Sequence, residues 1–323
     1  MRYKVNYMPG KSPVRRSIGA PRRVEKHRWL RSDGTPNFED RIYKSTEELE
    51  IIAKKPVKQA SPSTPLLEAV EEMAKGYRSL VITVSNKIAG LLLSTHVINY
   101  LGGGEYFKIV EERHGYNIYS ALQEPVQSIM EKNPIVAYID EKLSNILEKM
   151  VMNEIGIVPI VLRDGRVYGI ITEHDLIKYL SYSISIGVKV ADVMSSPVVT
   201  IESGRPIKEA MEKIIKYGFR RIPVVGENVV LGIITAMDII KYFGTHEAFK
   251  NTVSGDIREA LKIPVDDIMV RELVIIKPDD DLGLAAHKMA EKNVGSALVV
   301  NDKMELLGIV TERDILYALS IKK

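Results

Sequence analysis

Hydrophobic residues recur along this chain in one pattern that is repeated several times. Apolar residues spaced three and four apart, as at Ile207, Ala210, Met211 and Ile214, predict an amphipathic helix. A short apolar run, a polar turn and a second apolar run follow, and they predict two strands. A further helical stretch closes each unit. The pattern predicts β-α-β-β-α units with helices in SNILEKMVMNEI, IKEAMEKIIKYG and LGLAAHKMAEKN, and with strands in IVPIV, RIPVV and SALVV.

Each unit ends with the same motif, a Gly, two aliphatic residues, a Thr, two variable residues and an Asp. The motif begins at Gly169, Gly232 and Gly308, with gaps of 63 and 76 residues. A short helical segment that ends in Met precedes each unit. A degenerate fourth copy lies upstream, where Leu93 and His96 replace the Thr and the Asp. The chain is therefore built from internal repeats.

The order of the elements and the closing motif together resemble the CBS domain, over residues ~54–320. The resemblance implies that the units pair through their strands into two-unit Bateman modules. Pairing is also expected physically, because one such small unit cannot bury enough apolar area alone. The predicted fold is α/β (α+β), with four CBS repeats in two Bateman modules and an extended basic N-terminal arm. The predicted boundaries are 1–40 for the arm, 41–56 for a connecting helix, 57–103 for a degenerate repeat 1, 104–182 for a linker and repeat 2, 183–243 for repeat 3, and 244–323 for a linker and repeat 4.

The Thr and Asp of the motif have two interpretations. A Thr at the N-cap and an Asp three residues later form a capping box, and a carboxylate is favourable at a helix N-terminus. Alternatively, the carboxylate accepts hydrogen bonds from a ribose diol, while the Thr hydroxyl and the first-turn amides face phosphate. The resemblance favours the second role, because these positions bind adenine nucleotides in CBS proteins. It implies AMP, ADP or ATP as a regulatory ligand at Thr172, Asp175, Thr235, Asp238, Thr311 and Asp314.

Phosphate groups also require cations nearby. Arg220 and Arg221 precede the strand IPVV, and Arg313 lies inside the third motif, so these are candidate phosphate ligands. Each of them is alternatively a solvated surface arginine. Repeat 1 lacks the Thr and the Asp, so we expect its site to be empty or altered and at most three sites to be competent.

Other kinds of chemistry are not indicated by the sequence. We find no Ser/His/Asp arrangement, no paired carboxylates and no phosphate-binding loop, and six scattered histidines do not have metal-ligand spacing. The Gly-rich stretch 101–106 follows a helix and is expected to be a helix stop and linker. Cysteine is absent and no run reaches 18 apolar residues. We therefore expect a cytoplasmic, non-catalytic protein without metal; its Ile, Val, Lys and Glu content is typical of a thermophile.

The N-terminal arm differs from the rest of the chain in charge. Residues 1–31 contain ten Lys/Arg and one acid, a net +9, whereas the remaining residues sum to −6. Pro, Gly and Ser without an apolar period predict an extended segment, which is either a solvated tail or an RNA-binding arm. Arginines pair with phosphate and stack on bases, and a Trp adds stacking. The predicted RNA-binding residues are Arg15, Arg16, Arg22, Arg23, Lys26, Arg28, Trp29 and Arg31.

Four CBS repeats behind such an arm resemble the ribosome-associated hibernation and dimerization factors of archaea. The resemblance implies that the repeats bind AMP, ADP or ATP and that the arm docks on rRNA of the small ribosomal subunit. It also implies a homodimer that blocks initiation or links two subunits. One alternative is an AMP/ATP-sensing regulatory subunit of an enzyme, like the four-repeat gamma subunit of AMP-activated protein kinase. Another is a transcription-related regulator.

Overall fold

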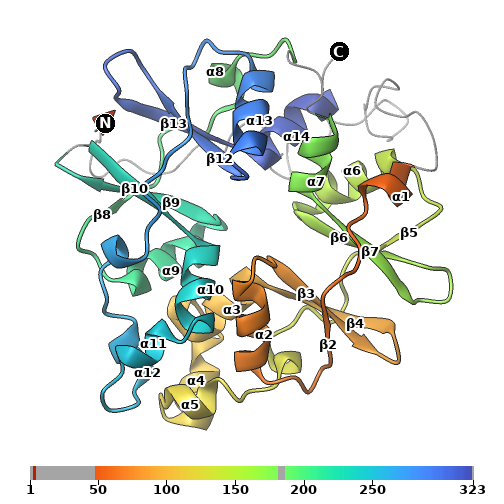
Figure 1. The fold of residues 1–323 in the computed structure, drawn as a ribbon, viewed down its shortest axis with the longest axis vertical. Helices are drawn as coiled ribbons and strands as arrows, with labels where there is room; N and C mark the ends of the chain where they lie inside the picture. Colours follow the sequence, from red (N-terminus) through yellow and green to blue (C-terminus); the bar gives the residue numbers. More distant parts are fainter. Residues whose placement is uncertain (1–2, 5–47, 181–185, 228, 322–323) are drawn as a thin grey trace. The chain divides into compact units, whose positions relative to one another are not determined.

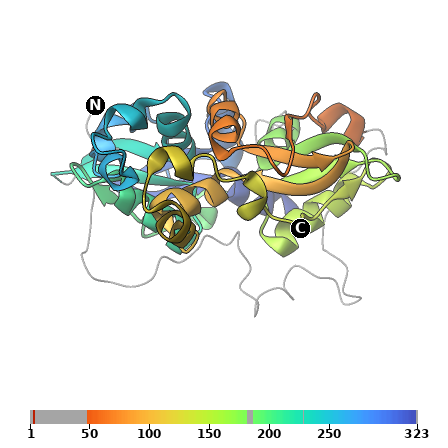
Figure 2. The same ribbon diagram turned by 90° about the horizontal axis from the view of Figure 1, so that it is seen from below.

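The computed structural model describes residues 3–4, 48–180, 186–227 and 229–321. Within these ranges the chain folds into four successive copies of a small sheet with two principal helices (Figures 1 and 2). The predicted mixed α/β fold of four CBS repeats paired into Bateman modules is confirmed. The first elements are β1 (Tyr3–Lys4) and α1 (Glu48–Ile52). The arm residues predicted to bind RNA lie outside the described ranges.

The four repeats have closely similar elements. Repeat 1 contains β2 (Gln59–Ala60), α2 (Leu66–Ala74), β3 (Ser79–Val84), β4 (Lys87–Leu93) and α3 (Ser94–Ile98). Repeat 2 contains β5 (Ala137–Tyr138), α6 (Leu143–Asn153), β6 (Ile157–Val161), β7 (Val167–Thr172) and α7 (Glu173–Leu180). Repeat 3 contains β8 (Ile201–Glu202), α9 (Ile207–Tyr217), β9 (Arg221–Gly226), β10 (Val229–Thr235) and α10 (Ala236–Gly244). Repeat 4 contains β11 (Ile275–Ile276), α13 (Leu282–Glu291), β12 (Ser296–Val300), β13 (Leu306–Thr311) and α14 (Glu312–Ile321).

Each repeat builds its sheet in the same way. A two-residue strand pairs in parallel with the middle strand, which then pairs in antiparallel fashion with the strand that carries the motif Gly and Thr. The parallel step is made by a helical crossover, as this strand arrangement requires. The middle strand Ile157–Val161 is buried along its whole length, which explains why its sequence is an unbroken apolar run.

The linkers between paired repeats are also helical. The first contains α4 (Phe107–His114), α5 (Ile118–Ala121) and the 3₁₀ turn η4 (Val126–Ser128), and the second contains α11 (Glu247–Lys250), α12 (Ile257–Ala260) and the 3₁₀ turn η5 (Val265–Asp267). The short helix α8 (Val190–Val193) holds the equivalent position before repeat 3. Each of these segments leads to a Met, as the sequence predicted.

The Gly-rich stretch after α3 is more ordered than a linker. The helix continues as a π-helical turn, η3 (Asn99–Gly103), and ends at a kink where Gly102 has a φ of 145°. Gly102 and Gly103 are buried, and a Cβ on Gly103 would lie 2.9 Å from the carbonyl oxygens of Ile98 and Met211. The helix stop is confirmed. However, these glycines serve close packing against α9, so the expectation of a plain linker was wrong.

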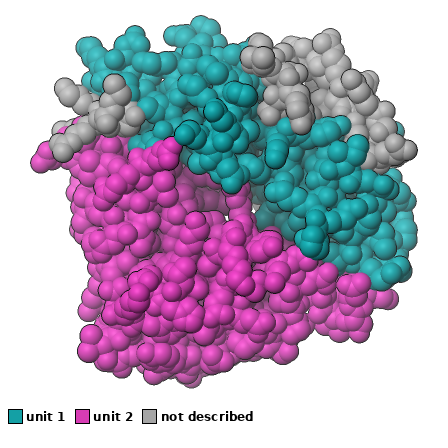
Figure 3. Space-filling view, in the orientation of Figure 1, with its two compact units in different colours: residues 1–56, 135–198, 273–323 teal, residues 57–134, 199–272 magenta. Residues whose placement is uncertain are grey.

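The chain divides into two compact units, each containing alternate repeats (Figure 3). Unit 1 comprises residues 1–56, 135–198 and 273–323, with repeats 2 and 4; unit 2 comprises residues 57–134 and 199–272, with repeats 1 and 3. One apolar core fills each unit. In unit 2, α2 lies so close to α10 that a Cβ on Gly244 would be 2.6 Å from Ala74 Cβ. The alternation of the repeats between units was not predictable from the order of the repeats.

Paired repeats exchange the short segments that precede them. The segment before repeat 1 forms a backbone bridge from Lys54 to Ile170 in repeat 2, and the segment before repeat 2 bridges from Glu131 to Leu91 in repeat 1. Repeats 3 and 4 exchange their segments in the same manner, through the bridges Val270 to Ile233 and Ser195 to Ile309. Each exchanged segment hydrogen-bonds to the strand that carries the motif Gly, and each of these bridges lies inside one compact unit. We call the four stretches that contain Lys54, Glu131, Ser195 and Val270 the exchanged segments.

The motif glycine is required by this exchange. A Cβ on Gly232 would lie 2.7 Å from Met269 Sδ and 2.8 Å from the Val270 carbonyl oxygen. A Cβ on Gly308 would lie 2.6 Å from Met194 Sδ. These separations are shorter than real Cβ contacts, so only Gly permits the approach. The repeated Met before a repeat and the repeated Gly inside the repeat that this segment contacts are therefore one packing feature.

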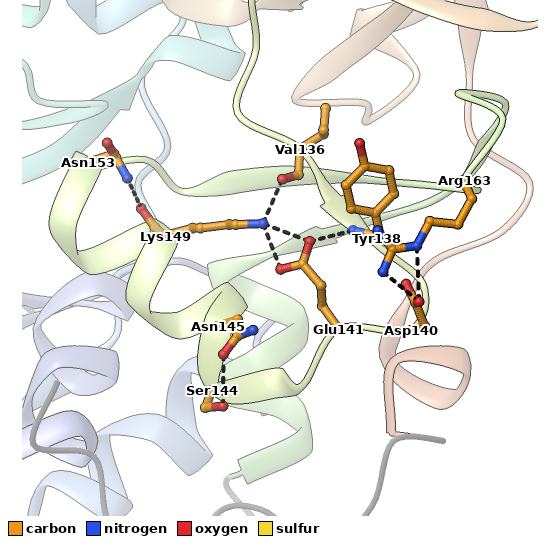
Figure 4. Close-up of polar contacts among 9 residues, drawn as sticks. All are labelled: Val136, Tyr138, Asp140, Glu141, Ser144, Asn145, Lys149, Asn153 and Arg163. Carbon is orange, nitrogen blue, oxygen red and sulfur yellow. Dashed lines mark hydrogen bonds and ion pairs between the residues drawn. The ribbon is translucent and has the colours of Figure 1, made fainter. Parts of the chain in front are cut away.

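A lysine ties the first helix of a repeat to its first strand (Figure 4). Lys149 Nζ of α6 donates to the Val136 carbonyl oxygen at 2.9 Å and contacts Glu141 Oε2 at 2.7 Å. Lys213 and Lys288 make the equivalent bond to a carbonyl in repeats 3 and 4. Repeat 1 places Glu72 at this position and pairs it with Lys58. Repeat 1 has therefore diverged here as well as in its motif.

Candidate functional site

The Thr and Asp of each complete motif meet where a strand ends and a helix begins. In repeat 3, Thr235 is the N-cap of α10, and its backbone N–H and its hydroxyl both donate to Asp238 Oδ2, at 2.8 and 2.7 Å. The Asp238 N–H donates back to Thr235 Oγ1 at 3.3 Å. The capping interpretation is thus confirmed for this pair. The same three bonds are made by Thr172 with Asp175.

Repeat 4 repeats the arrangement at the start of α14. The Thr311 N–H and hydroxyl each donate to Asp314 Oδ2 at 2.8 Å. Asp175 and Asp314 are 6% and 4% exposed, and Asp238 is partly buried. Burial raises the pKa of Asp238, although the two bonds from Thr235 oppose this effect. In each pair the cap uses Oδ2 of the carboxylate.

Repeat 1 keeps the cap but changes its chemistry. The Leu93 N–H donates to His96 Nδ1 at 3.3 Å, so the imidazole takes the role of the missing carboxylate. Burial lowers the pKa of His96, and the charge of Glu131 opposes this shift. A lowered pKa favours the neutral ring, which is the form that can accept the Leu93 bond. The carboxylate expected to hold a ribose is absent from this repeat.

The candidate arginines of repeat 3 lie next to the motif. Arg221 is the residue that pairs with Thr235 across β9 and β10, and the Arg220 carbonyl accepts a hydrogen bond from the Ala236 N–H at 2.8 Å. Glycines occupy the Arg220 position in repeats 2 and 4, where the Glu173 and Glu312 amides donate to Gly156 and Gly295. Repeat 3 is therefore the complete motif that carries strand arginines beside it. In repeat 1, Arg78 occupies this position, and its carbonyl oxygen accepts a hydrogen bond from the Ser94 N–H.

Arg313 lies in a buried charged cluster of unit 1. Its Nε donates to Glu173 Oε1 at 2.7 Å, and His174 Nδ1 lies 2.6 Å from Glu312 Oε1. Glu173 and Glu312 are 2% and 1% exposed. Burial lowers the pKa of Arg313, but the charge of Glu173, the effect of Tyr317, the hydrogen bond to Glu173 and the smaller effect of Asp314 together outweigh burial and raise the pKa. Arg313 thus joins α14 to α7. Sequence reasoning missed this contact, because it considered Arg313 either as a phosphate ligand or as a solvated surface residue.

Unit 2 lacks a counterpart of this cluster at the same helix positions. Ser94 and Ala236 occupy the places of Glu173 and Glu312, and both are buried. The repeated acid directly after the motif Thr in repeats 2 and 4 was the available signal in the sequence. Across the described residues, no group of three or more His, Asp or Glu side chains is placed to hold a metal ion.

Lys54 enters the site of repeat 2 from an exchanged segment. Its Nζ lies 2.7 Å from Asp175 Oδ1, the oxygen that the Thr172 cap does not use. The Lys54 side chain is 60% exposed, whereas that of Asp175 is 5% exposed. The next residue, Lys55, lies over the Tyr168 ring, 3.8 Å from its centroid. Neither lysine was singled out from the sequence, because both belong to the segment before another repeat.

None of the helices in the part of the chain that the structure describes combines the length and hydropathy needed to cross a membrane. This agrees with the lack of long apolar runs in the sequence.

Comparison with known proteins identifies the repeats. The family model of the CBS domain matches residues 48–103, 126–182, 190–245 and 265–321. The protein MJ1225 of Methanocaldococcus jannaschii is 30% identical, over 83% of this chain and 97% of that protein. Its crystal structure, described as that of a candidate archaeal homologue of γ-AMPK, aligns with a TM-score of 0.78.

Two further proteins are similar at lower identity or over less of the chain. A 33.4 kDa protein from the ribosomal RNA operon of Thermofilum pendens is 29% identical, over 71% of this chain and 76% of that protein. A crystal structure from Pyrococcus horikoshii covers 83% of this chain with a TM-score of 0.54 at 18% identity, and it shares the fold. With four matches that together span most of its length, the chain belongs to the CBS domain family.

Proposed function

We propose that this chain is a non-catalytic sensor of adenine nucleotides that acts on the ribosome in the cytoplasm. The observation that carries the ligand half is the set of three Thr–Asp pairs, in which a partly or fully buried carboxylate is fixed at a helix N-terminus. One carboxylate oxygen is held by the cap, and the other is oriented to accept hydrogen bonds from the vicinal hydroxyls of a ribose. The helix amides would favour the phosphate.

Repeat 3 is the best candidate for a phosphorylated ligand. Arg221 begins β9 opposite Thr235 and Arg220 directly precedes it, so both residues lie beside the end of the strand that carries the motif. Repeats 2 and 4 have Gly156 and Gly295 at the position of Arg220. We therefore expect AMP, ADP or ATP to bind most tightly at repeat 3, with Thr235 and Asp238 at the ribose end and the arginines at the phosphate end.

The ribosomal half of the proposal depends on the arm. Ten basic residues and one acid in the first 31 residues match the phosphate density of RNA. The similarity to a protein encoded in a ribosomal RNA operon supports this assignment. We propose that the arm contacts small-subunit rRNA through the arginines between residues 15 and 31, and that a homodimer presents two arms and gains avidity from them.

A regulatory subunit of an enzyme is the second candidate function. It is favoured by the similarity to MJ1225, which is described as a candidate homologue of γ-AMPK. In that case the arm would bind an acidic protein partner, and the repeats would still report the ratio of AMP to ATP. The two candidates share the ligand and differ in the macromolecule that is bound.

Sedimentation of a cell lysate tests the assignment to the ribosome. The full chain is expected to travel with the small subunit, and a variant that lacks residues 1–40 should remain at the top of the gradient while it still binds AMP. The log of the binding constant should fall with the log of the salt concentration, by roughly 0.7–0.9 per phosphate contact. Absence of the full chain from ribosomal fractions in every growth phase, with co-purification of an enzyme instead, would favour the second candidate.

A further inference from the structure

The four exchanged segments place different side chains at one equivalent position beside the motif. This position is the residue whose backbone bridges to the strand directly after the motif Gly. It is occupied by Glu131 facing repeat 1, Lys54 facing repeat 2, Val270 facing repeat 3 and Ser195 facing repeat 4. Each pair of bridging residues lies within one compact unit.

The charge at this position is related to the residue that closes the motif. In repeat 2 the closing residue is an aspartate, Asp175, and the exchanged segment brings Lys54 Nζ to 2.7 Å from it. In repeat 1 the closing residue is His96, and the exchanged segment brings an acid, Glu131. In repeats 3 and 4 the aspartates face exchanged segments whose residue at this position carries no charge. The motifs of repeats 1 and 2 therefore face a charged residue at this position, whereas those of repeats 3 and 4 face an uncharged one.

We infer that Lys54 is an internal competitor for the ligand carboxylate of repeat 2, and that the exchanged residue ranks the affinities of the sites. This inference rests on the proposed binding of adenine ligands. A ribose diol that donates two hydrogen bonds to Asp175 has to displace Lys54 Nζ from Oδ1, since Oδ2 already accepts two bonds from Thr172 and Oδ1 has room for two donors. The residues at the equivalent position of repeats 3 and 4, Val270 and Ser195, carry no charge.

Geometry supports a displaceable contact rather than a fixed structural one. The Lys54 side chain is 60% exposed, so its ammonium group can return to water without a large loss. Its backbone stays anchored by two hydrogen bonds. The Lys54 N–H donates to the Ile170 carbonyl oxygen at 2.9 Å, and the Ile170 N–H donates to the Lys54 carbonyl oxygen at 3.3 Å. Only the side chain has to move. The segment continues directly from α1, so a ligand in repeat 2 changes the charge environment of the chain that joins the arm to the repeats.

Titration calorimetry with adenosine tests the inference on the full-length chain. Adenosine carries the diol and no phosphate, so a freed lysine gains no anionic partner from the ligand. Asp238→Asn and Asp314→Asn are introduced together to leave repeat 2 as the remaining complete motif. In this background Lys54→Ala should tighten adenosine binding about two- to fivefold, the range that an exposed ion pair allows. Lys55→Ala, which removes the neighbouring lysine on Tyr168, is the matched control and should change nothing.

A reciprocal variant moves the competitor to another site. Val270→Lys introduces a cation at the equivalent position of repeat 3, where Val270 is 40% exposed and a longer side chain fits. It should weaken adenosine binding at Asp238 by a similar factor, in a background with Asp175→Asn and Asp314→Asn. Raising the salt concentration should narrow the difference between each variant and its parent, because salt screens the ion pair.

The outcomes separate this inference from the proposed function. If adenosine binds but Lys54→Ala leaves the affinity of repeat 2 equal to that of Lys55→Ala, the inference is wrong and nucleotide sensing stands. The same holds if Val270→Lys has no effect on repeat 3. If neither adenosine nor AMP binds the unmodified chain, the proposed function fails, and the inference fails with it.

Discussion

Replacing Gly232 by Ala should destabilise unit 2 more than the corresponding change at Gly169 destabilises unit 1. The added Cβ of Gly232→Ala would lie 2.7 Å from Met269 Sδ and 2.8 Å from a backbone oxygen of Val270. This oxygen belongs to the exchanged segment and accepts a hydrogen bond from the Ile233 N–H, while the Val270 N–H donates to the Ile233 carbonyl oxygen. The two bonds fix the Val270 backbone, so its displacement is costly. At Gly169 the nearest atom is Ala53 Cβ at 3.0 Å, and the carbonyl oxygen of Lys54 is 3.3 Å away.

The expected magnitude follows from the cost of overpacking a buried contact. Such insertions cost about 1–3 kcal/mol, and the two close contacts put Gly232→Ala at ~2–3 kcal/mol. Gly169→Ala should cost less than ~1 kcal/mol, since its neighbours need to shift by only a few tenths of an ångström. Neither glycine has a positive φ, so backbone strain adds nothing in either case. Both glycines face an exchanged segment, so the difference in stability isolates how closely that segment approaches the glycine.

Urea and thermal unfolding of both variants measure this difference. A loss of 1 kcal/mol lowers Tm by roughly 2–4 °C for a domain of 150–250 residues, so Gly232→Ala should melt several degrees below Gly169→Ala. Adding Met269→Ala to Gly232→Ala should cost less than the sum of the single changes, because the shorter side chain removes one of the two close contacts. Equal stability of the two glycine variants would show that the exchanged segments yield freely, contrary to the packing described.

Two further variants test the charged groups of the motif. Asp238→Asn should keep Tm unchanged or raise it, because an amide oxygen still accepts the cap bonds and a buried charge is removed, while calorimetry shows weaker AMP binding at repeat 3. Burial raises the folded pKa of Asp238 above its unfolded value, so its contribution to the free energy of unfolding is present in acid and is lost as pH rises through the raised pKa; the variant should lack this slope in unfolding measured across the acid range. Arg313→Ala should cost unit 1 about 3–5 kcal/mol in chemical denaturation, because Glu173 stays buried without its guanidinium, and Glu173→Gln in the same chain should recover part of the loss. A stable Arg313→Ala protein would place this arginine outside the core.

The elements of the repeats were predictable because their periodicity is local. The 3.6-residue period of Ile207–Tyr217 and the apolar run Ile157–Val161 depend on neighbours a few positions away, and both gave the observed element. The capping of α10 by Thr235 was predictable for the same reason. Such patterns predict local geometry, and they do not predict which distant segment covers it.

The role of the motif glycines and of Lys54 could not be predicted from local pattern. Each glycine is required by a Met or Ala that belongs to the segment before another repeat, and Lys54 reaches a carboxylate 121 positions later in the chain. The position of Arg313 was missed because a motif arginine suggested a phosphate partner, whereas its partner is Glu173. One non-local signal was available, since IYSALQEPVQSIM and IREALKIPVDDIM, which begin at Ile118 and Ile257, show that a pair of repeats with its linker is duplicated.

The strength of the Lys54 contact bounds how far nucleotide can control the arm through repeat 2. An ion pair with one exposed partner contributes ~0–1 kcal/mol. Because coupling is reciprocal, the coupling free energy between ligand binding at repeat 2 and a change at Lys54 cannot exceed this contribution. The coupling through this contact is then at most about fivefold in affinity. A larger effect of AMP on the proposed ribosome binding would require another route, such as a rearrangement of α1, whose Leu49 and Ile52 are buried in the core of unit 1. Comparing the AMP response of the unmodified chain with that of Lys54→Ala decides between these routes. A response that falls by more than fivefold in the variant would contradict the bound, and one that persists unchanged would assign control to the packing of α1.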